Sequence, residues 1–250
     1  MNGEFLNDVL CALTAKHFLR TGVFVPVERE YVEGGAFVFA TDDPAAVPVV
    51  SWDEAVFNWV NRLRDAGTSD VWFFGQWAGQ SLHVLGFVGG AGNRRAVAAK
   101  SPTGSSAWTA NWTFDRNAKQ WVVRYYEAVQ PTPLPVLQLD PSVEFLDTLT
   151  GLEDLARRIG FNAFATLFAE AAQFLTDASI PVDGPASMPV RYHRLWAAAQ
   201  RSWVFGAMGS WNDSPPFAAR EAGLEAVYDE LSARLYRNII EASSLAVNGW

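Results

Sequence analysis

The chain has 250 residues, of which 50% are hydrophobic and 18% are charged, and it holds 11 Trp and 17 Phe. This composition excludes an intrinsically disordered protein and is typical of a globular chain with an aromatic-rich core. The net charge of -8 and the isoelectric point near 4.9 disfavour binding to nucleic acid or to an anionic membrane. They favour a neutral or basic protein partner.

Cys11 is the only cysteine, so the chain cannot form an intramolecular disulfide or a cluster of thiolate ligands. The N-terminal residues lack the basic region of a signal peptide, and no run of about 18 apolar residues predicts a membrane-spanning helix. We therefore expect a cytoplasmic protein that makes no membrane contact.

Two helices are predicted in the first third of the chain. Residues 4–20 place apolar side chains at helical spacing, and the following Thr21-Gly22 pair is typical of a helix end. A second helix over 51–66 begins with a capping box, in which Ser51 is followed three residues later by Glu54. Both helices offer an apolar face for packing.

The residues between these helices predict a β-hairpin. Runs rich in β-forming residues occupy 23–33 and 36–40, and Gly34-Gly35 lies between them. Paired glycines between two such runs indicate a tight turn.

From 70 to 129 the apolar period changes to two, with turn signals at regular intervals. This pattern predicts a five-stranded antiparallel meander. The predicted fold class is therefore α+β, with N-terminal helices on a mainly antiparallel meander sheet, followed by a helical C-terminal domain.

Tryptophans recur on one face of a strand in this region. Trp108, Ala110, Trp112 and Phe114 alternate with polar residues, so they share a face. Either a covering helix packs on them or they form a surface for a ligand or partner. Trp108 and Trp112 are candidate interaction residues on the second interpretation.

A proline-rich connector at 131–135 predicts a domain boundary. It would separate an α+β domain over 1–130 from a helical domain over 136–250. Within the second part we expect a short helix from Asp140-Pro141 to about 149 and a new segment capped by Thr150 and Glu153. Four later helices are predicted: one over 161–175, one that ends at about 203, one that begins at Ser214-Pro215 and one over 224–246.

Residues 205–213 read Phe-Gly-Ala-Met-Gly-Ser-Trp-Asn-Asp, which predicts a shaped corner between two helices. On a structural interpretation Trp211 seals the corner, and Asp213 or Ser214 caps the next helix. On a functional interpretation Trp211 and Asp213 anchor a partner, because tryptophan is enriched at interface hot spots.

This stretch, from Phe205 to Asp213, resembles a segment near the C-terminus of uncharacterised bacterial proteins, some of which are proposed immunity proteins of toxin systems. The resemblance covers about the last quarter of the chain and supplies no catalytic residues. It implies a binding protein.

The sequence carries no catalytic, cofactor-binding or metal-binding signature. His17, His83 and His193 are far apart in the chain and have no second ligand at metal-binding spacing. No serine stands in the Gly-x-Ser-x-Gly frame of a nucleophile elbow. We therefore predict no bound metal and no cofactor.

The favoured function is a non-enzymatic cytosolic protein-binding protein, of the type of an immunity inhibitor of a basic bacterial effector. One alternative is a small-molecule hydrolase or transferase with a site assembled from distant residues such as His83, Asp213 and Glu127. Another is an obligate homo-oligomer, in which the many aromatic residues form the self-interface. A deep pocket that joins two titratable residues would favour the enzyme, and a flat aromatic or acidic surface would favour binding.

Overall fold

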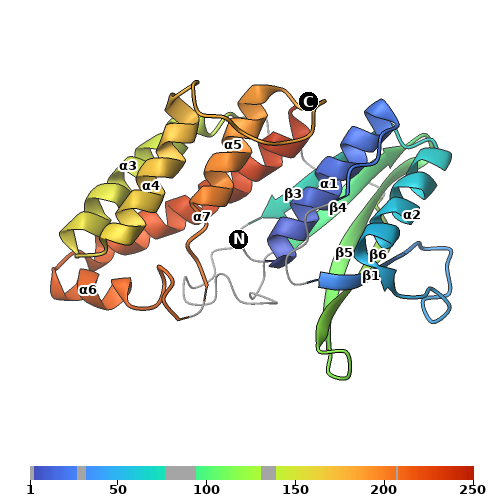
Figure 1. Ribbon diagram of the computed structural model, residues 1–250, viewed down its shortest axis with the longest axis horizontal. Helices are drawn as coiled ribbons and strands as arrows, with labels where there is room; N and C mark the ends of the chain where they lie inside the picture. The colour runs from blue at the N-terminus through green and yellow to red at the C-terminus, as the bar shows by residue number, and fades with distance from the viewer. Residues whose placement is uncertain (1–2, 27–31, 77–93, 131–138, 207) are drawn as a thin grey trace.

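The computed structural model describes residues 3–26, 32–76, 94–130, 139–206 and 208–250. These residues form an α+β fold in which a sheet carrying two helices stands beside a bundle of five (Figure 1). The sheet part comprises α1 (Gly3–Thr21), β1 (Val32–Val38), β2 (Val50–Ser51), α2 (Trp52–Asp65), β3 (Asp70–Gln76), β4 (Arg94–Ser101), β5 (Gly104–Asp115) and β6 (Gln120–Gln130). The bundle comprises α3 (Ser142–Arg158), α4 (Asn162–Thr176), α5 (Val190–Arg201), α6 (Pro215–Glu221) and α7 (Glu225–Asn248).

The sheet is mixed, which corrects the prediction of a mainly antiparallel meander. Its strand order is β2-β1-β6-β5-β4-β3, and β1 runs parallel to β6 while the other neighbours are antiparallel. Strands β3 to β6 follow one another as a meander, so the prediction holds locally. The described residues hold four strands between 70 and 130 where five were predicted, and the turn signals at 79–80 and 89–93 lie outside them.

The predicted hairpin at Gly34-Gly35 is wrong, because both glycines lie inside strand β1. A Cβ atom at Gly35 would come within 2.6 Å of Cε3 of Trp52, and one at Gly34 within 2.9 Å of the Val49 side chain. Gly35 therefore allows the start of α2 to approach the strand closely, and Gly34 allows the same for the segment just before it, since glycine in a strand often marks such a close approach.

Helices α1 and α2 lie on the sheet and build an aromatic core there. Helix α1 packs against β3 and β4, and α2 packs against β1 (Figure 1). The ring of Phe37 is stacked between Trp59 at 4.5 Å and Tyr125 at 4.7 Å between centroids. Trp108 meets the edge of Trp59 at 5.6 Å. Such aromatic contacts add to the burial of apolar area.

In the second half of the chain, every element of the described residues after 139 is a helix, as predicted. The break expected at Thr150 is wrong, since α3 runs through it and Thr150 Oγ1 donates to the Leu146 carbonyl oxygen over 2.9 Å. A Cβ atom at Gly151 would lie 3.2 Å from Cδ2 of Leu231. The interior glycine thus provides a close approach between α3 and α7 rather than a helix end.

The two halves meet along α7. Helix α7 packs on β3, and one buried hydrophobic cluster contains residues from both halves. The buried Lys16 of α1 pairs with Asp70 over 3.1 Å and donates to the Val247 carbonyl oxygen over 3.0 Å. The division into two domains stays a prediction, and its connector at 131–135 lies outside the described residues. No helix among the described residues combines the length and apolarity needed to cross a membrane.

The outer edge of β3 is covered by side-chain hydrogen bonds. Asn248, at the end of α7, accepts from the Phe73 backbone N–H over 3.0 Å and donates to the Phe73 carbonyl oxygen over 2.9 Å. The Asp70 side chain accepts from the Val71 N–H over 2.9 Å. Because an open strand edge is a template for pairing with another chain, these bonds protect the sheet.

Replacing Asn248 with alanine removes both bonds to Phe73. We expect a loss of about 1–2 kcal/mol in the free energy of unfolding, because one donor and one acceptor lose their partners. Asn248→Asp, which keeps an acceptor but lacks the N–H donor, serves as the matched comparison and should not be more stable than wild type. Urea denaturation measures all three proteins, and an Asn248→Ala midpoint equal to wild type would contradict the assignment.

Candidate functional site

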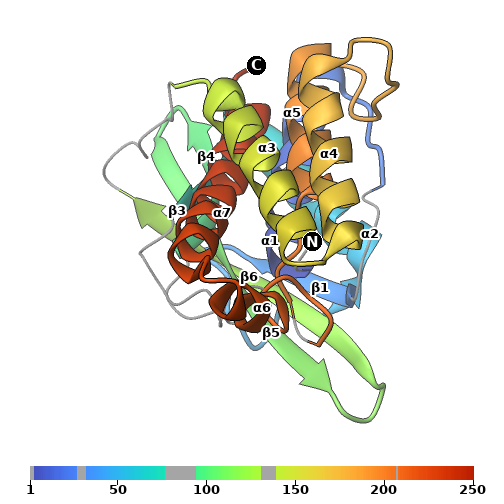
Figure 2. The same ribbon diagram turned by 90° about the vertical axis from the view of Figure 1, so that its left-hand side faces the viewer.

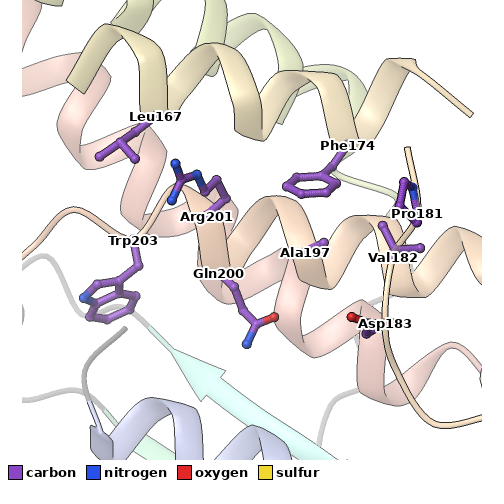
Figure 3. Close-up of a pocket in the computed structure, with 9 residues that line it drawn as sticks. All are labelled: Leu167, Phe174, Pro181, Val182, Asp183, Ala197, Gln200, Arg201 and Trp203. Carbon is purple, nitrogen blue, oxygen red and sulfur yellow. The ribbon is translucent and has the colours of Figure 1, made fainter. Parts of the chain in front are cut away.

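A groove lies between α4, α5 and the segment 177–189 that links them (Figure 3). Its volume is about 550 Å³, within the range of about 300–1,000 Å³ in which proteins hold ligands. The lining mixes apolar and polar groups and is formed by Leu167, Phe174, Pro181, Val182, Asp183, Ala197, Gln200, Arg201 and Trp203.

Arg194 fixes the turn that begins the link. Its guanidinium donates to four backbone carbonyl oxygens, those of Phe174 over 3.3 Å, Asp177 over 2.5 Å, Ala178 over 2.6 Å and Ile180 over 3.0 Å. The last carbonyls of a helix have no partner within the helix, so a cation there satisfies them and favours the helix dipole. One side chain of α5 therefore holds both the end of α4 and the following turn.

The second part of the link is anchored by two histidines. His193 Nε2 donates to the Pro185 carbonyl oxygen over 3.1 Å, and His17 Nδ1 pairs with Ser187 Oγ over 2.7 Å. A Cβ atom at Gly184 would come within 2.9 Å of the His193 ring. Glycine at this position thus lets the link lie directly against α5, and the wall of the groove is fixed at both ends.

The charges of the groove leave one carboxylate uncompensated. Arg201 Nε donates to Glu170 Oε2 over 2.7 Å, so this cation is paired. Asp183 and Gln200 make no side-chain hydrogen bond to any other described residue, and both polar ends are drawn at the same side of the groove in Figure 3. The site therefore combines apolar side chains and polar groups with an exposed anion, which suits a cationic ligand that is partly apolar.

Trp203 joins the groove to the core beneath it. Its indole N–H donates to the Phe205 carbonyl oxygen over 2.9 Å. The ring centroid lies 5.3 Å from that of Phe5 on α1 and 5.8 Å from that of Tyr236 on α7. The position of this groove residue therefore depends on how α1 and α7 pack.

Trp211 is fully buried, as its structural interpretation requires. Its indole N–H donates to Ser232 Oγ over 2.8 Å, and its ring meets the edges of Phe164 and Phe168 at 5.3 and 5.2 Å. Tyr228 donates its hydroxyl hydrogen to the Trp211 carbonyl oxygen over 2.7 Å. These contacts join α4, the corner and α7, and leave the indole inaccessible to a partner.

Asp213 stabilises the corner itself. Its Oδ2 accepts from the Gly209 N–H over 2.9 Å, and Gly209 has a positive φ of 78° that favours glycine. The N-cap of α6 is Ser214, but neither it nor Asp213 caps the helix with its side chain, which corrects that expectation. The corner leaves Met208 95% exposed.

The two candidate tryptophans of β5 have different surroundings. Trp108 is 1% exposed and packs beneath α2, so the covering helix explains it. Trp112 is half-buried further along the strand and contacts Trp121 at 6.4 Å, beside Phe114, which is 45% exposed. The β5–β6 hairpin projects beyond the helices in both views (Figures 1 and 2), and of these three rings only Phe114 is exposed.

The described residues provide little for the enzyme alternative. His83 lies outside them, and Asp213 bonds within its corner. Glu127 on β6 accepts instead from the Ala40 N–H over 2.9 Å. Among the residues that the structure describes, no group of three His, Cys, Asp or Glu side chains is placed to hold a metal ion.

A buried group of charges with a perturbed pKa lies where α1 crosses the sheet. Arg95 of β4 donates to Glu4 over 2.9 Å and to Asp8 over 3.3 Å, and the Tyr125 hydroxyl donates to Asp8 over 2.6 Å. Burial raises the pKa of Asp8 to about 6, although Arg95 and Tyr125 act in the opposite direction. Burial also raises the pKa of the nearby Cys11 thiol. Asp8 is only 4% exposed, so its carboxyl group is not accessible to a substrate.

No family model matches the sequence, and comparisons with characterised proteins and with solved structures find no significant similarity. The candidate site therefore rests on geometry. Sequence reasoning missed Asp183, Arg194 and Arg201, since an isolated charge on a helix or link carries no motif. The signal that did exist was the irregular, proline-rich link itself, because ordered loops between helices often carry function.

Truncating Trp211 should destabilise the fold. We expect Trp211→Ala to lower the free energy of unfolding by about 3–5 kcal/mol, because a cavity forms and Ser232 loses its partner. Thermal and urea denaturation measure the effect, with Met208→Ala as a matched substitution in the same corner that should leave the melting temperature unchanged. A wild-type melting temperature in Trp211→Ala would instead favour a role in partner binding.

Removing the guanidinium at 194 should loosen the wall of the groove. Arg194→Gln leaves most of the four carbonyls without a donor, and we expect a loss of about 2 kcal/mol in stability. Hydrogen exchange should accelerate in the 177–183 segment. Arg158→Gln, which breaks only an exposed pair with Asp154, is the control and should change stability by less than about 0.5 kcal/mol. Equal exchange in both variants would show that Arg194 does not order the link.

Proposed function

We propose that this chain is a non-enzymatic binding protein that holds a basic, partly apolar segment of a partner protein in the α4–α5 groove. The observation that carries the proposal is the groove itself, whose fixed walls place apolar side chains beside the uncompensated Asp183. A preformed site costs little ordering on binding, so such geometry favours recognition.

Charge supports the choice of partner. The chain carries a net charge of -8, and the Arg201–Glu170 pair neutralises the cation in the lining. An acidic protein attracts a basic partner over distance, and the carboxylate at the site then selects a cationic side chain.

The finer form of the proposal is an immunity-type inhibitor of a basic bacterial effector that acts in the cytoplasm. It rests on the resemblance at 205–213 together with the acidic charge of the chain. Because Trp211 is buried and bonded within the fold, we propose that the partner binds in the groove and not at the corner.

The test compares partners recovered with the tagged wild-type chain and with three variants expressed in the native host. Ala197→Trp fills the groove and Asp183→Lys reverses its charge, and each should reduce the recovered partner at least tenfold. Ala163→Trp, on an exposed position of α4 outside the lining, is the control and should retain it.

The recovered protein should be basic, and purified partner should bind wild type and Ala163→Trp with equal affinity in calorimetry. Circular dichroism establishes that every variant is folded. A partner that binds Ala197→Trp and Asp183→Lys as tightly as wild type does would place recognition elsewhere on the molecule.

A further inference from the structure

Strand β5 extends well past the end of its pairing with β4. Strand β4 pairs with β5 over 104–108, whereas β6 pairs with it over 105–115. Beyond Trp108, no strand among the described residues pairs with the β4 side of β5. Residues 109–115 therefore form a strand edge, here called the open edge, in the hairpin that projects beyond the helices (Figures 1 and 2).

The direction of the backbone groups at the open edge follows from the pairing. The Lys100 carbonyl oxygen accepts from the Ser69 N–H over 2.8 Å on the side of β3, so the next residue, Ser101, faces β5. Its partner Gly104 then faces β4, and so does every second residue after it, because the pairing of β5 has no register shift. The residues that direct their N–H and carbonyl groups outward at the open edge are therefore Ala110, Trp112 and Phe114.

The open edge lacks the features that protect strand edges. It contains no proline, and its one charged residue is Asp115 at the far end. The other edges of the sheet differ, since β2 has only two residues and the β3 edge is bonded to Asn248. An edge without such protection is a template for a strand of another chain, and threonine, tryptophan and phenylalanine favour strand pairing.

We propose that the open edge of β5 pairs with the open edge of a second copy of this chain, in the antiparallel direction. A two-fold axis at Trp112 gives the register that uses every outward backbone group. Trp112 then exchanges both of its hydrogen bonds with Trp112 of the second copy, and Ala110 exchanges its bonds with Phe114. The two sheets become one continuous sheet across the dimer.

The side chains of the open edge suit pairing with themselves. On the face toward the helices, the small Ala110 lies opposite Phe114, which is 45% exposed in the single chain, and the two Trp112 rings meet at the axis. On the other face, the exposed Asn111 lies opposite the exposed Thr113. Aromatic and polar pairs across neighbouring strands stabilise a sheet, and this register places no like charges opposite one another.

The local charge allows two acidic chains to meet at this place. The chain carries a net charge of -8, but the hairpin over 104–130 is nearly neutral. Its three cations and two anions are Arg116, Lys119, Arg124, Asp115 and Glu127. An approach through the hairpin therefore meets less repulsion than the net charge alone implies. Because one pair of strands buries less area than a standard interface, we expect a monomer–dimer equilibrium that depends on concentration.

The first measurement is the mass of the pure wild-type chain, by light scattering after size exclusion and by sedimentation velocity. As the concentration rises from the low micromolar to the high micromolar range, the mass should rise from 27.5 kDa towards twice that value. The interface contains no lining residue of the α4–α5 groove, so the result is independent of partner binding there.

Thr109 provides a pair of variants that tests the register. Its side chain is exposed, and in the dimer it lies opposite Asp115 of the second copy. Thr109→Glu opposes like charges twice and should raise the Kd of the dimer about fivefold, whereas Thr109→Lys opposes unlike charges and should lower it by a similar factor. Met208→Glu and Met208→Lys make the same changes in net charge at an exposed residue of the corner and should leave the Kd at its wild-type value.

Amide hydrogen exchange tests the backbone pairing without any substitution. In concentrated wild type, the outward N–H groups of Ala110, Trp112 and Phe114 should exchange about tenfold more slowly than in dilute protein, because pairing protects them. The N–H groups of Asn111 and Thr113 face β6 and should exchange equally at both concentrations. This alternation distinguishes pairing of the open edge from general crowding of the hairpin.

Three results would overturn the proposal. The first is a mass that stays at 27.5 kDa at every concentration. The second is a charge effect at position 208 as large as that at position 109, which would assign association to net charge. The third is a dimer whose outward amides exchange as fast as in the monomer, which would place the interface elsewhere. A chain that is monomeric when pure, and gains protection at Trp112 only with a different protein, would assign the open edge to that protein.

Discussion

Helix α1 is buried on nearly every side although three of its charged residues, Glu4, Asp8 and Lys16, lie in the interior, and this constraint organises the molecule. Lys16 needs Asp70 and the carbonyl at the end of α7, while Glu4 and Asp8 need Arg95. Because each unpaired charge would cost several kcal/mol in the interior, the helix is stable only where β3, β4 and α7 are placed together around it. The pairs thus fix the register of the sheet, of α1 and of the C-terminal helix relative to one another.

The sheet depends on a second close approach. Gly35 lets the start of α2 lie against β1, and in this position Trp59 of the same helix stacks on Phe37 in the aromatic core. With α2 in position, β1 pairs with β6 in the parallel direction and extends the antiparallel strands. On the opposite edge of the sheet, the Asn248 side chain forms hydrogen bonds with the backbone N–H and carbonyl oxygen of Phe73 in β3. These side-chain bonds satisfy backbone groups on the β3 edge, which would otherwise be open to pairing with a strand of another chain.

One wall of the groove is an irregular backbone segment that side chains of α5 hold in place. Arg194 and His193 satisfy carbonyl oxygens that a loop would otherwise present to water, so the link holds one conformation without regular structure. Trp203 belongs both to this groove and to the core beside α1. The surface proposed for binding is therefore supported by the aromatic packing of α1 and α7 beneath Trp203.

The sequence by itself determined the local elements: the helix over 4–20, the capped helix that begins after Ser51, the strands within 70–76 and 94–129, and the helical second half. Apolar periodicity and capping residues indicate the local backbone conformation and which face of an element is buried. Both signals come from residues that are close together in the sequence. It also placed Trp211 in a tight corner, but the partners that bury it come from α4 and α7. Only the tertiary structure decided that Gly34-Gly35 lie within a strand, that α3 continues through Thr150 and that Asp183 and Trp203 share a groove. Each of these features depends on a contact between residues that are distant in the chain. A local sequence pattern does not specify which distant residues will pack against a given element.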